Sequence, residues 1–474
     1  MLGIRDIVVM HMRVCLDSII DKVLGDVPEY REFMTVNELY RSNFKLVEKY
    51  GNVAEILEIG TSRSGDPIYA LRIGNGDNIV LAFGFPHPNE PVGSLTLEYL
   101  SWKLVRDKEF LKLTKSTFLI VKVADVFGAK LNEGWFKGPF SIVKYAINYY
   151  RPPGYKQVEW SFPVEYKELK WDKPIEETKA LMKLIDEYKP DYIYSLHNAG
   201  FKGVYYYLSR PLPDIHPKLK ELPRKLGVPL HLGEPEAPYM KKLDNAIFKM
   251  PGIKESYDFL EKYLKDKKPI EVIKHGGSSY DYALRYKPEV IEVVCEVPYI
   301  YDRLLENTNK VGVLMRDVVL CSLVRYRELV DIIKGYIEKI SPYTDYNNPF
   351  YESLSEFMKR ANYYIKSEEE WARKDPSLER PATIAEVFDA LTVNIYWPTI
   401  LRLGLLYRAI GYIINEKKEL KEKLEPLRRE VYNKISYYAD LFSKASKYVI
   451  IPVRKLVQIQ LGAILYTLLY TLHR

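Results

Sequence analysis

The sequence is poor in cysteine and histidine. The three cysteines, Cys15, Cys295 and Cys321, are too few and too scattered for a disulfide framework or a thiolate metal site. This scarcity favours a reducing compartment, so we expect a cytoplasmic protein. The seven histidines are few enough to be considered one by one.

A strong excess of one charge and a long apolar run are also lacking. The 70 Lys and Arg residues face 63 Asp and Glu residues, and no basic helix or phosphate-binding loop is evident. We therefore expect no nucleic-acid partner. The longest apolar stretch, 461–472, is shorter than a bilayer requires, and charged residues interrupt the first twenty positions. We expect neither a membrane span nor a signal peptide.

Two patterns divide the chain, which is longer than one domain of roughly 100–200 residues. Apolar runs alternating with helical periodicity between about 55 and 300 predict an α/β sheet. After about 303 the pattern is helical. We expect an N-terminal helical extension (1–34), an α/β domain (35–302) and an all-α domain (303–474). The predicted strands are 66–73, 78–85, 116–124, 190–197, 203–208 and 290–297, and the predicted later helices are 310–340, 350–366, 385–415, 426–446 and 452–473.

The segment 452–473 is apolar on nearly every face. This pattern is typical of a helix buried in a bundle or a subunit interface, and it favours burial over attachment to a membrane surface. A homo-oligomer formed through the C-terminal helices is therefore a hypothesis. The 40 tyrosines, with abundant Lys, Glu and Ile, are typical of a thermophile.

A histidine and a carboxylate follow the predicted strand 78–85. His87 and Glu90 lie just past its C-terminal end, the edge at which open α/β sheets bind ligands. His231 and Glu234 have the same spacing without a comparable strand before them. Either pair alone is more typical of a surface loop than of a site.

A second apolar strand, 190–197, ends on His197. Together with His87 and Glu90 it makes two histidines and one carboxylate, a set that suits a catalytic zinc ion with one position left for water. By itself, His197 is as consistent with an imidazole bonded to the backbone.

The apolar strand 290–297 carries two glutamates, a costly placement unless they are paired or used. Period-two alternation puts Glu292 and Glu296 on one face, and Glu296 lies nearer the edge where the histidines emerge. Glu296 is therefore the predicted general acid/base, and Glu292 is the alternative.

These elements in this order resemble the M14 zinc carboxypeptidases, over about residues 35–300. The resemblance rests on His87 and Glu90, His197, the Gly276-Gly277-Ser278 turn, strand-borne Glu296 and the turn Gly60-Thr61-Ser62-Arg63-Ser64-Gly65. It implies a three-layer α/β/α domain with a mixed sheet, followed here by an all-α helical domain.

The resemblance also implies a function. One zinc ion per chain would be held by His87, Glu90 and His197, and the activated water would attack an amide bond of a peptide or small molecule. Glu296 would be the general acid/base, and Arg151 would stabilise the oxyanion; an exposed loop arginine is an equal alternative for Arg151.

The chain departs from the family in the substrate region. Where carboxypeptidases carry an Asn-Arg pair that grips the substrate's carboxylate, this chain has Glu159-Trp160-Ser161. Glu159 would favour a cationic group, and Lys274 or His275 would supply a cation elsewhere. The candidate substrate-binding residues are Glu159, Trp160, Lys274, His275 and Tyr280.

The missing clamp keeps two other functions open. One is a zinc amidohydrolase or deacylase that acts on a non-peptide or blocked amide. The other is a catalytically silent binding or assembly protein on the same fold, although a retained buried carboxylate such as Glu296 argues against it.

Overall fold

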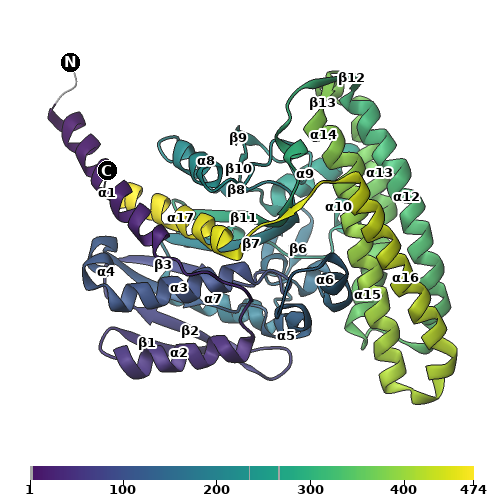
Figure 1. Cartoon of the computed structure of the whole chain (residues 1–474), viewed down its shortest axis with the longest axis horizontal. Helices are drawn as coiled ribbons and strands as arrows, with labels where there is room; N and C mark the ends of the chain where they lie inside the picture. The colour runs from purple at the N-terminus through teal and green to yellow at the C-terminus, as the bar shows by residue number, and fades with distance from the viewer. Residues whose placement is uncertain (1–3, 234, 265–266, 474) are drawn as a thin grey trace.

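A computed structural model describes residues 4–233, 235–264 and 267–473 (Figure 1). Within these residues, the larger part of the molecule is built on a mixed sheet of ten strands. The predicted strands are confirmed with changes at their ends, and β1, β9, β10 and β14 were not predicted. The order is β1 (Ala54–Thr61), β2 (Pro67–Ile73), β4 (Ser116–Val121), β3 (Asn78–Phe83), β7 (Tyr192–Phe201), β11 (Ile291–Tyr301), β8 (Tyr205–Leu208), β10 (Ile247–Lys249) and β9 (Lys242–Asp244), with β14 (Val449–Ile450) paired to β11.

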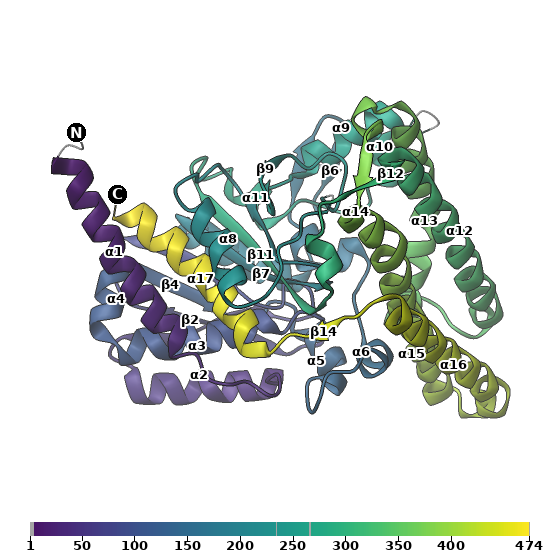
Figure 2. The ribbon, with the colours of Figure 1, turned by 45° about the horizontal axis from the view of Figure 1, so that its top comes forward.

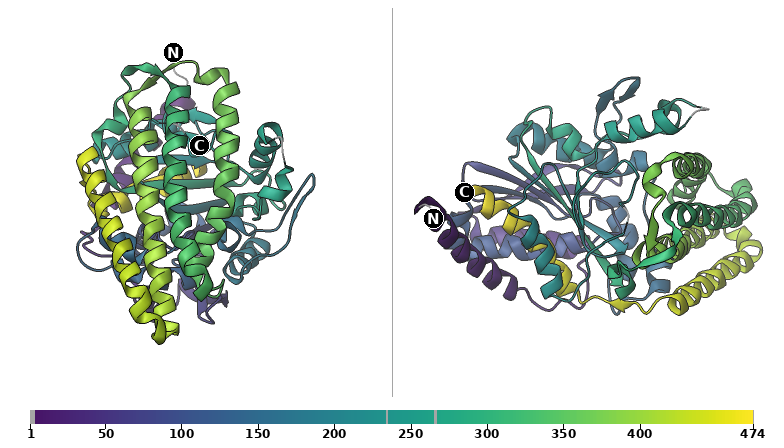
Figure 3. Two further views of the ribbon diagram at one scale, coloured as in Figure 1. Left: turned by 90° about the vertical axis from the view of Figure 1, so that its right-hand side faces the viewer. Right: turned by 90° about the horizontal axis from the view of Figure 1, so that it is seen from above.

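The centre of the sheet is parallel, and helices cover both faces (Figure 3). β4, β3, β7 and β11 run parallel and are almost wholly buried, which explains their apolar runs. α3 (Val92–Arg106) and α17 (Val453–Leu472) pack side by side on one face, and α7 (Glu176–Tyr188) contacts β1 and α11 (Ser279–Ala283) on the other. The predicted three-layer α/β/α architecture is confirmed.

The last helix, α17, returns from the helical part to the sheet. It packs against β11, β7, α1 (Ile4–Gly25) and α8 (His216–Lys225), and the hydroxyl groups of Tyr194 and Thr467 lie 2.9 Å apart. By length and composition α17 could cross a membrane, but 83% of its apolar window is buried inside the molecule. The predicted burial is confirmed, although α17 covers the sheet rather than filling a helical bundle or a subunit interface.

Four long helices form a row on one side of the molecule (Figures 1, 2 and 3). They are α12 (Met315–Ile340), α13 (Pro349–Lys374), α15 (Asn394–Glu416) and α16 (Lys421–Ala445). The helix predicted from residue 310 begins only at Met315, because Lys310–Leu314 forms β12, which pairs with β13 (Pro381–Thr383).

The helical row packs against the edge of the α/β part. α15 contacts α6 (Ile142–Asn148), and a Cβ added at Gly404 would lie 2.0 Å from the Ala146 carbonyl oxygen, so only glycine permits this approach. Arg408 donates to the Asn148 carbonyl (2.7 Å), and Lys156 pairs with Glu352 of α13 (2.7 Å). The long helices therefore cover the region where the parallel strands end.

The remaining elements include α2 (Val36–Tyr50), α4 (Lys108–Thr114), α5 (Val126–Asn132), β5 (Val164–Tyr166), β6 (Leu169–Trp171), α9 (Ile253–Tyr263), α10 (Pro269–Val272) and α14 (Ile384–Phe388).

Candidate active site

Three neighbouring parallel strands bring the candidate metal ligands and Glu296 to one edge of the sheet. His87 and Glu90 follow β3, and His197 lies in β7 directly opposite Glu296 of β11. Phe85, fully buried, adopts a left-handed backbone (φ 52°) in the turn after β3, a conformation that costs energy for a non-glycine residue. The packing around Phe85 thus holds the turn that leads to His87.

The side chains of His87, Glu90 and His197 offer ligand atoms that all lie within 4.8 Å of one another. His87 Nδ1 is 3.0 Å from Glu90 Oε1, and His197 Nδ1 is 3.0 Å from Glu90 Oε2. Two buried ring nitrogens, His87 Nε2 and His197 Nδ1, have no hydrogen-bond partner among the described residues. Two imidazoles and one carboxylate, with nitrogen atoms left unsatisfied, fit a zinc ion.

Burial and the charges of neighbouring residues strongly shift the pKa values of the three candidate ligands. Burial, followed by the positive charge of Arg151, lowers the pKa of His87 to about 4, so its imidazole is neutral at pH 7, as a metal ligand must be. Burial alone would raise the pKa of Glu90, but the two histidines lower it well below its usual value. For His197, burial is outweighed by Glu296 and Glu90, which raise its pKa to about 9. A metal ion must therefore displace a proton from His197.

Ser195 positions the ring of His197. Its hydroxyl donates to Glu159 Oε1 (2.7 Å) and lies 2.8 Å from His197 Nε2. Because the hydroxyl proton is used toward Glu159, Ser195 accepts from the Nε2–H of His197, so Nδ1 is the nitrogen that would give up its proton to a metal. Sequence reasoning missed Ser195, although period-two alternation places it on the same side of β7 as His197.

Backbone groups and α17 complete the support of this centre. The backbone N–H of Asn198 donates to Glu90 Oε2 (3.2 Å). From α17, the fully buried Gln460 donates to the carbonyl of His197 (2.8 Å) and accepts from the Thr96 hydroxyl (2.9 Å). The most C-terminal helix is thus bonded to a candidate ligand residue.

Glu296 is buried at the edge of this group. Its Oε1 lies 3.7 Å from His197 Nδ1, and its Oε2 has no partner within the part of the chain that the structure describes. Burial, reinforced by Glu90 and Glu236 and opposed by His197, raises its pKa well above the usual value. A carboxyl group with a raised pKa next to a metal site has the properties of a general acid/base.

Glu292, the alternative base, lies in a different environment. Its Oε1 accepts from the Ser279 hydroxyl (2.8 Å), which also lies 3.1 Å from the Glu159 carboxylate. Glu292 thus joins a buried polar network on the α11 side of the sheet, and the geometry favours Glu296.

Arg151 connects the metal-ligand group to a large cavity. Its Nη1 lies 3.2 Å from Glu90 Oε1, and the residue lines a cavity of about 880 Å³. Asn89 and Asn198, the sequence neighbours of two ligand residues, also line it. The cavity therefore opens directly beside the candidate metal centre.

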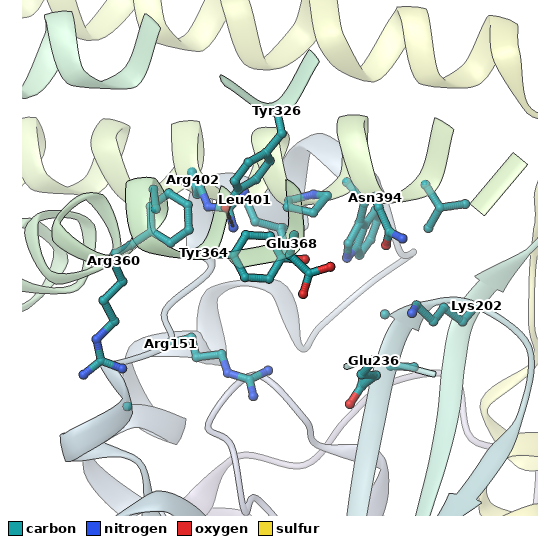
Figure 4. A pocket seen from close by; sticks show the side chains of 18 of the residues that line it. Arg151, Lys202, Glu236, Tyr326, Arg360, Tyr364, Glu368, Asn394, Leu401 and Arg402 are labelled. Atoms are coloured by element: carbon teal, nitrogen blue, oxygen red, sulfur yellow. Dashed lines mark hydrogen bonds between the residues drawn. The ribbon is translucent and has the colours of Figure 1, made fainter. Parts of the chain in front are cut away.

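The helical row forms the other wall of the cavity (Figure 4). Side chains of α12, α13 and α15 face Arg151 and Glu236 across it. Glu236 accepts hydrogen bonds from Tyr205 (2.6 Å) and Tyr207 (3.0 Å). Sequence reasoning missed this wall, which includes Tyr326, Arg360, Tyr364, Glu368, Asn394, Leu401 and Arg402.

Two of the five predicted substrate-binding residues line the cavity. They are Trp160 and His275, whose rings meet edge to face with centroids 5.4 Å apart. The Nδ1 of His275 lies 2.9 Å from the carbonyl of Gly276, and burial lowers its pKa to about 4. This lowered pKa favours the neutral form of His275 at pH 7, which argues against His275 as the source of a cation.

The other three predicted substrate residues are not among those that line the cavity. Glu159 is buried, and its carboxylate is used within the protein by Ser195 and Ser279. The Lys274 ammonium donates to the carbonyl of Ile270 (3.1 Å). The Tyr280 hydroxyl is directed to a backbone carbonyl (3.4 Å). The resemblance to carboxypeptidases compares sequence positions and gives no side-chain directions. It therefore could not show that Glu159, Lys274 and Tyr280 do not line the cavity.

The second histidine–glutamate pair is only partly described. His231 is buried, and its ring lies 5.3 Å from that of Tyr205, whereas Glu234 lies outside the described residues.

Comparison with known proteins agrees with the sequence resemblance. The family model Peptidase_M14, described as zinc carboxypeptidase, matches residues 40–138, the segment with His87 and Glu90. The resemblance to this family is thus confirmed, and the helical row lies outside the matched segment. No curated protein matches the sequence.

Several solved structures share part of the fold at low sequence identity. A putative metallopeptidase from Shewanella amazonensis has 14% identity and a TM-score of 0.38, covering 56% of this chain and 84% of that one. Carboxypeptidase A from Helicoverpa armigera has 16% identity and a TM-score of 0.35, with 61% and 72% covered. A metallo-carboxypeptidase from Burkholderia cenocepacia has 13% identity and a TM-score of 0.32, with 56% and 60% covered.

Proposed function

We propose that this zinc carboxypeptidase-like chain is a zinc-dependent hydrolase of amide bonds. The observation that carries the proposal is the convergence of His87, Glu90 and His197 at one sheet edge, with Glu296 in register beside His197. These residues come from three separate strands, and their meeting at one point supports a shared chemical role.

The chain's own residues would divide the work. His87, Glu90 and His197 would hold one zinc ion, which supplies a Lewis acid that polarises a carbonyl group and acidifies water. Glu296 would take a proton at Oε2, the oxygen without a partner among the described residues, and return it to the leaving nitrogen. Arg151, at the cavity wall, would stabilise negative charge that develops on the carbonyl oxygen.

The cavity supports a small substrate or a chain end. A volume of about 880 Å³ between the sheet edge and the helical row is in the usual size range of small-ligand sites. The buried Glu159 occupies the segment where carboxypeptidases carry their clamp for a substrate carboxylate. This supports the second candidate, an amidohydrolase or deacylase that acts on a blocked or non-peptide amide.

Metal content and point variants test the proposal. We expect about one zinc per chain, measured by elemental analysis, and its loss in His87→Ala and His197→Ala. The matched control is His216→Ala, because His216 is also a buried histidine but lies in α8. This variant keeps the zinc. Purified protein that holds no zinc under metal-replete conditions would show that the proposal is wrong.

The assignment of the base is tested on the same strand. Glu296→Gln retains zinc and lowers amide hydrolysis by about 10²- to 10⁴-fold, because it removes the proton acceptor. Glu292→Gln keeps most of the activity, because the Glu292 carboxyl group bonds Ser279 rather than a candidate metal ligand. The reverse ranking would transfer the role to Glu292, and zinc-loaded protein without turnover on a broad amide panel would favour a silent binding protein.

A further inference from the structure

One carboxylate on the helical wall of the cavity has no partner. Glu368 of α13 lines the cavity with only 8% of its surface exposed. Across the described ranges it makes no hydrogen bond or ion pair. Figure 4 shows its carboxylate directed into the cavity, with Arg151 and Glu236 on the opposite side. Burying a carboxylate without a partner is unfavourable, so its retention here calls for a ligand.

Neighbouring charges do not satisfy Glu368. The guanidinium of Arg402 lies over the ring of Phe357, 3.7 Å from its centroid, and Arg360 donates to the carbonyl of Lys274 (3.2 Å). Burial is the cause that raises the pKa of Glu368 to about 7, with no cation lowering it.

Two other carboxylates of the cavity, Glu236 and Glu356, have partners within the protein. Glu236 accepts two tyrosine hydroxyls, and Glu356, also on α13, pairs with Lys359 (2.6 Å). Glu368 differs from these two by offering its charge to the cavity itself.

Aromatic rings line the same cavity, and Figure 4 shows those of Tyr326 and Tyr364 near Glu368. Tyr326, Tyr364, Trp371 and Trp397 all line it. Aromatic faces next to a carboxylate are the surroundings that recognise ammonium and guanidinium groups, because the ring quadrupole and the carboxylate both attract a cation.

We propose that Glu368 binds a cationic group of the substrate, an ammonium or guanidinium, on the cavity wall opposite Arg151. The inference rests on the proposed function in so far as it takes this cavity to be the substrate site. Glu368 would then select substrates by charge. A neutral substrate would fill the same space and leave the carboxylate buried without a partner.

Peptide binding tests this selection without relying on hydrolysis. The probes are short acetylated peptides in matched pairs, with arginine in one member and citrulline, its uncharged isostere, in the other. The arginine is placed at the first, middle or last position in different pairs, and lysine peptides paired with norleucine peptides distinguish ammonium from guanidinium. Affinities are measured by calorimetry on the full chain carrying Glu296→Gln, with and without zinc.

We expect at least one charged peptide to bind about 10- to 100-fold more tightly than its neutral partner, the usual effect of a charge-assisted hydrogen bond. Adding Glu368→Gln removes this preference, and adding Glu356→Gln, the paired carboxylate of the same helix and cavity, preserves it. Equal affinities, no binding by any peptide, or a preference that survives Glu368→Gln would overturn the inference. If the preference depends on Glu368 but the protein with its original Glu296 takes up no zinc and hydrolyses no amide, the proposed function alone is refuted.

Discussion

Replacing Ser195 with alanine tests whether its hydroxyl prepares His197 for a metal. The fully buried Oγ lies 2.7 Å from Glu159 Oε1 and 2.8 Å from His197 Nε2. Without the hydroxyl, the ring loses the acceptor that holds the proton on Nε2, and the tautomer with the proton on Nδ1 competes. That tautomer has no lone pair on the nitrogen that faces Glu90.

The size of the effect follows from the two bonds removed. Loss of a hydrogen bond that orients a metal-ligating histidine lowers metal affinity by about 10- to 100-fold, or ~1.4–2.8 kcal/mol. Leaving the buried Nε2–H of His197 unpaired destabilises the zinc-free fold by ~1–3 kcal/mol. Glu159 suffers less, since Ser279 still donates to it.

Two measurements separate these effects. Zinc affinity is measured by competition with a chelator, and the stability of the zinc-free protein by urea unfolding. Ser101→Ala is the control, because Ser101 is also fully buried but bonds a carbonyl of its own helix (2.9 Å). Glu159→Gln, which keeps an acceptor oxygen, retains more affinity than Ser195→Ala. Unchanged zinc affinity in a folded Ser195→Ala protein would refute the proposed positioning.

Two further predictions concern the helical row. Gly404→Ala lowers the melting temperature, because the added Cβ would lie 2.0 Å from a backbone oxygen of Ala146. Gly335→Ala in α12 is the control: its added Cβ meets no atom within 4 Å, so the substitution raises the melting temperature through helix propensity. Equal melting temperatures of the two variants would contradict the packing of α15 on α6. Glu368 has a pKa of about 7 against an ordinary 4.5, so the folded state binds more protons than the unfolded state between these pH values. Its stabilising effect is complete below about pH 4.5 and falls by ~3 kcal/mol as the pH rises to 7. Urea unfolding should therefore show a larger advantage of Glu368→Gln over the original protein at pH 8 than at pH 5, and an equal difference at both would refute this.

The parts of the site that the sequence predicts are those encoded locally. β3, β7 and β11 are near-continuous apolar runs because both faces of the sheet are covered, and parallel strands bring their carboxyl ends to one edge. His87 and Glu90 follow the end of β3, and His197 and Glu296 lie in register in the C-terminal halves of β7 and β11. Strand pattern and spacing were therefore enough to predict that they meet.

The cavity wall depends on docking, which local patterns do not encode. The periodicity of α13 predicts a helix but not which surface it packs against, so nothing in the sequence brings Glu368 toward Arg151, more than two hundred positions earlier. The inward turn of Glu159 likewise depends on Ser195 and Ser279, which belong to distant elements. The same limit applies to α17, whose apolar surface predicted burial but not the sheet as its partner.

The position of α17 sets the order in which the protein can be completed during synthesis. β11 ends at Tyr301, so the strands that carry His87, His197 and Glu296 are all made before the helical row begins. At about 5–20 residues per second, roughly 8–30 s pass before α17 follows. Until then the sheet face beneath His197 is uncovered, and the carbonyl of His197 lacks its bond to Gln460. The nascent chain therefore exposes the part of the sheet face that α17 later covers, and completion of the hydrogen bonds around His197 is a late step of folding.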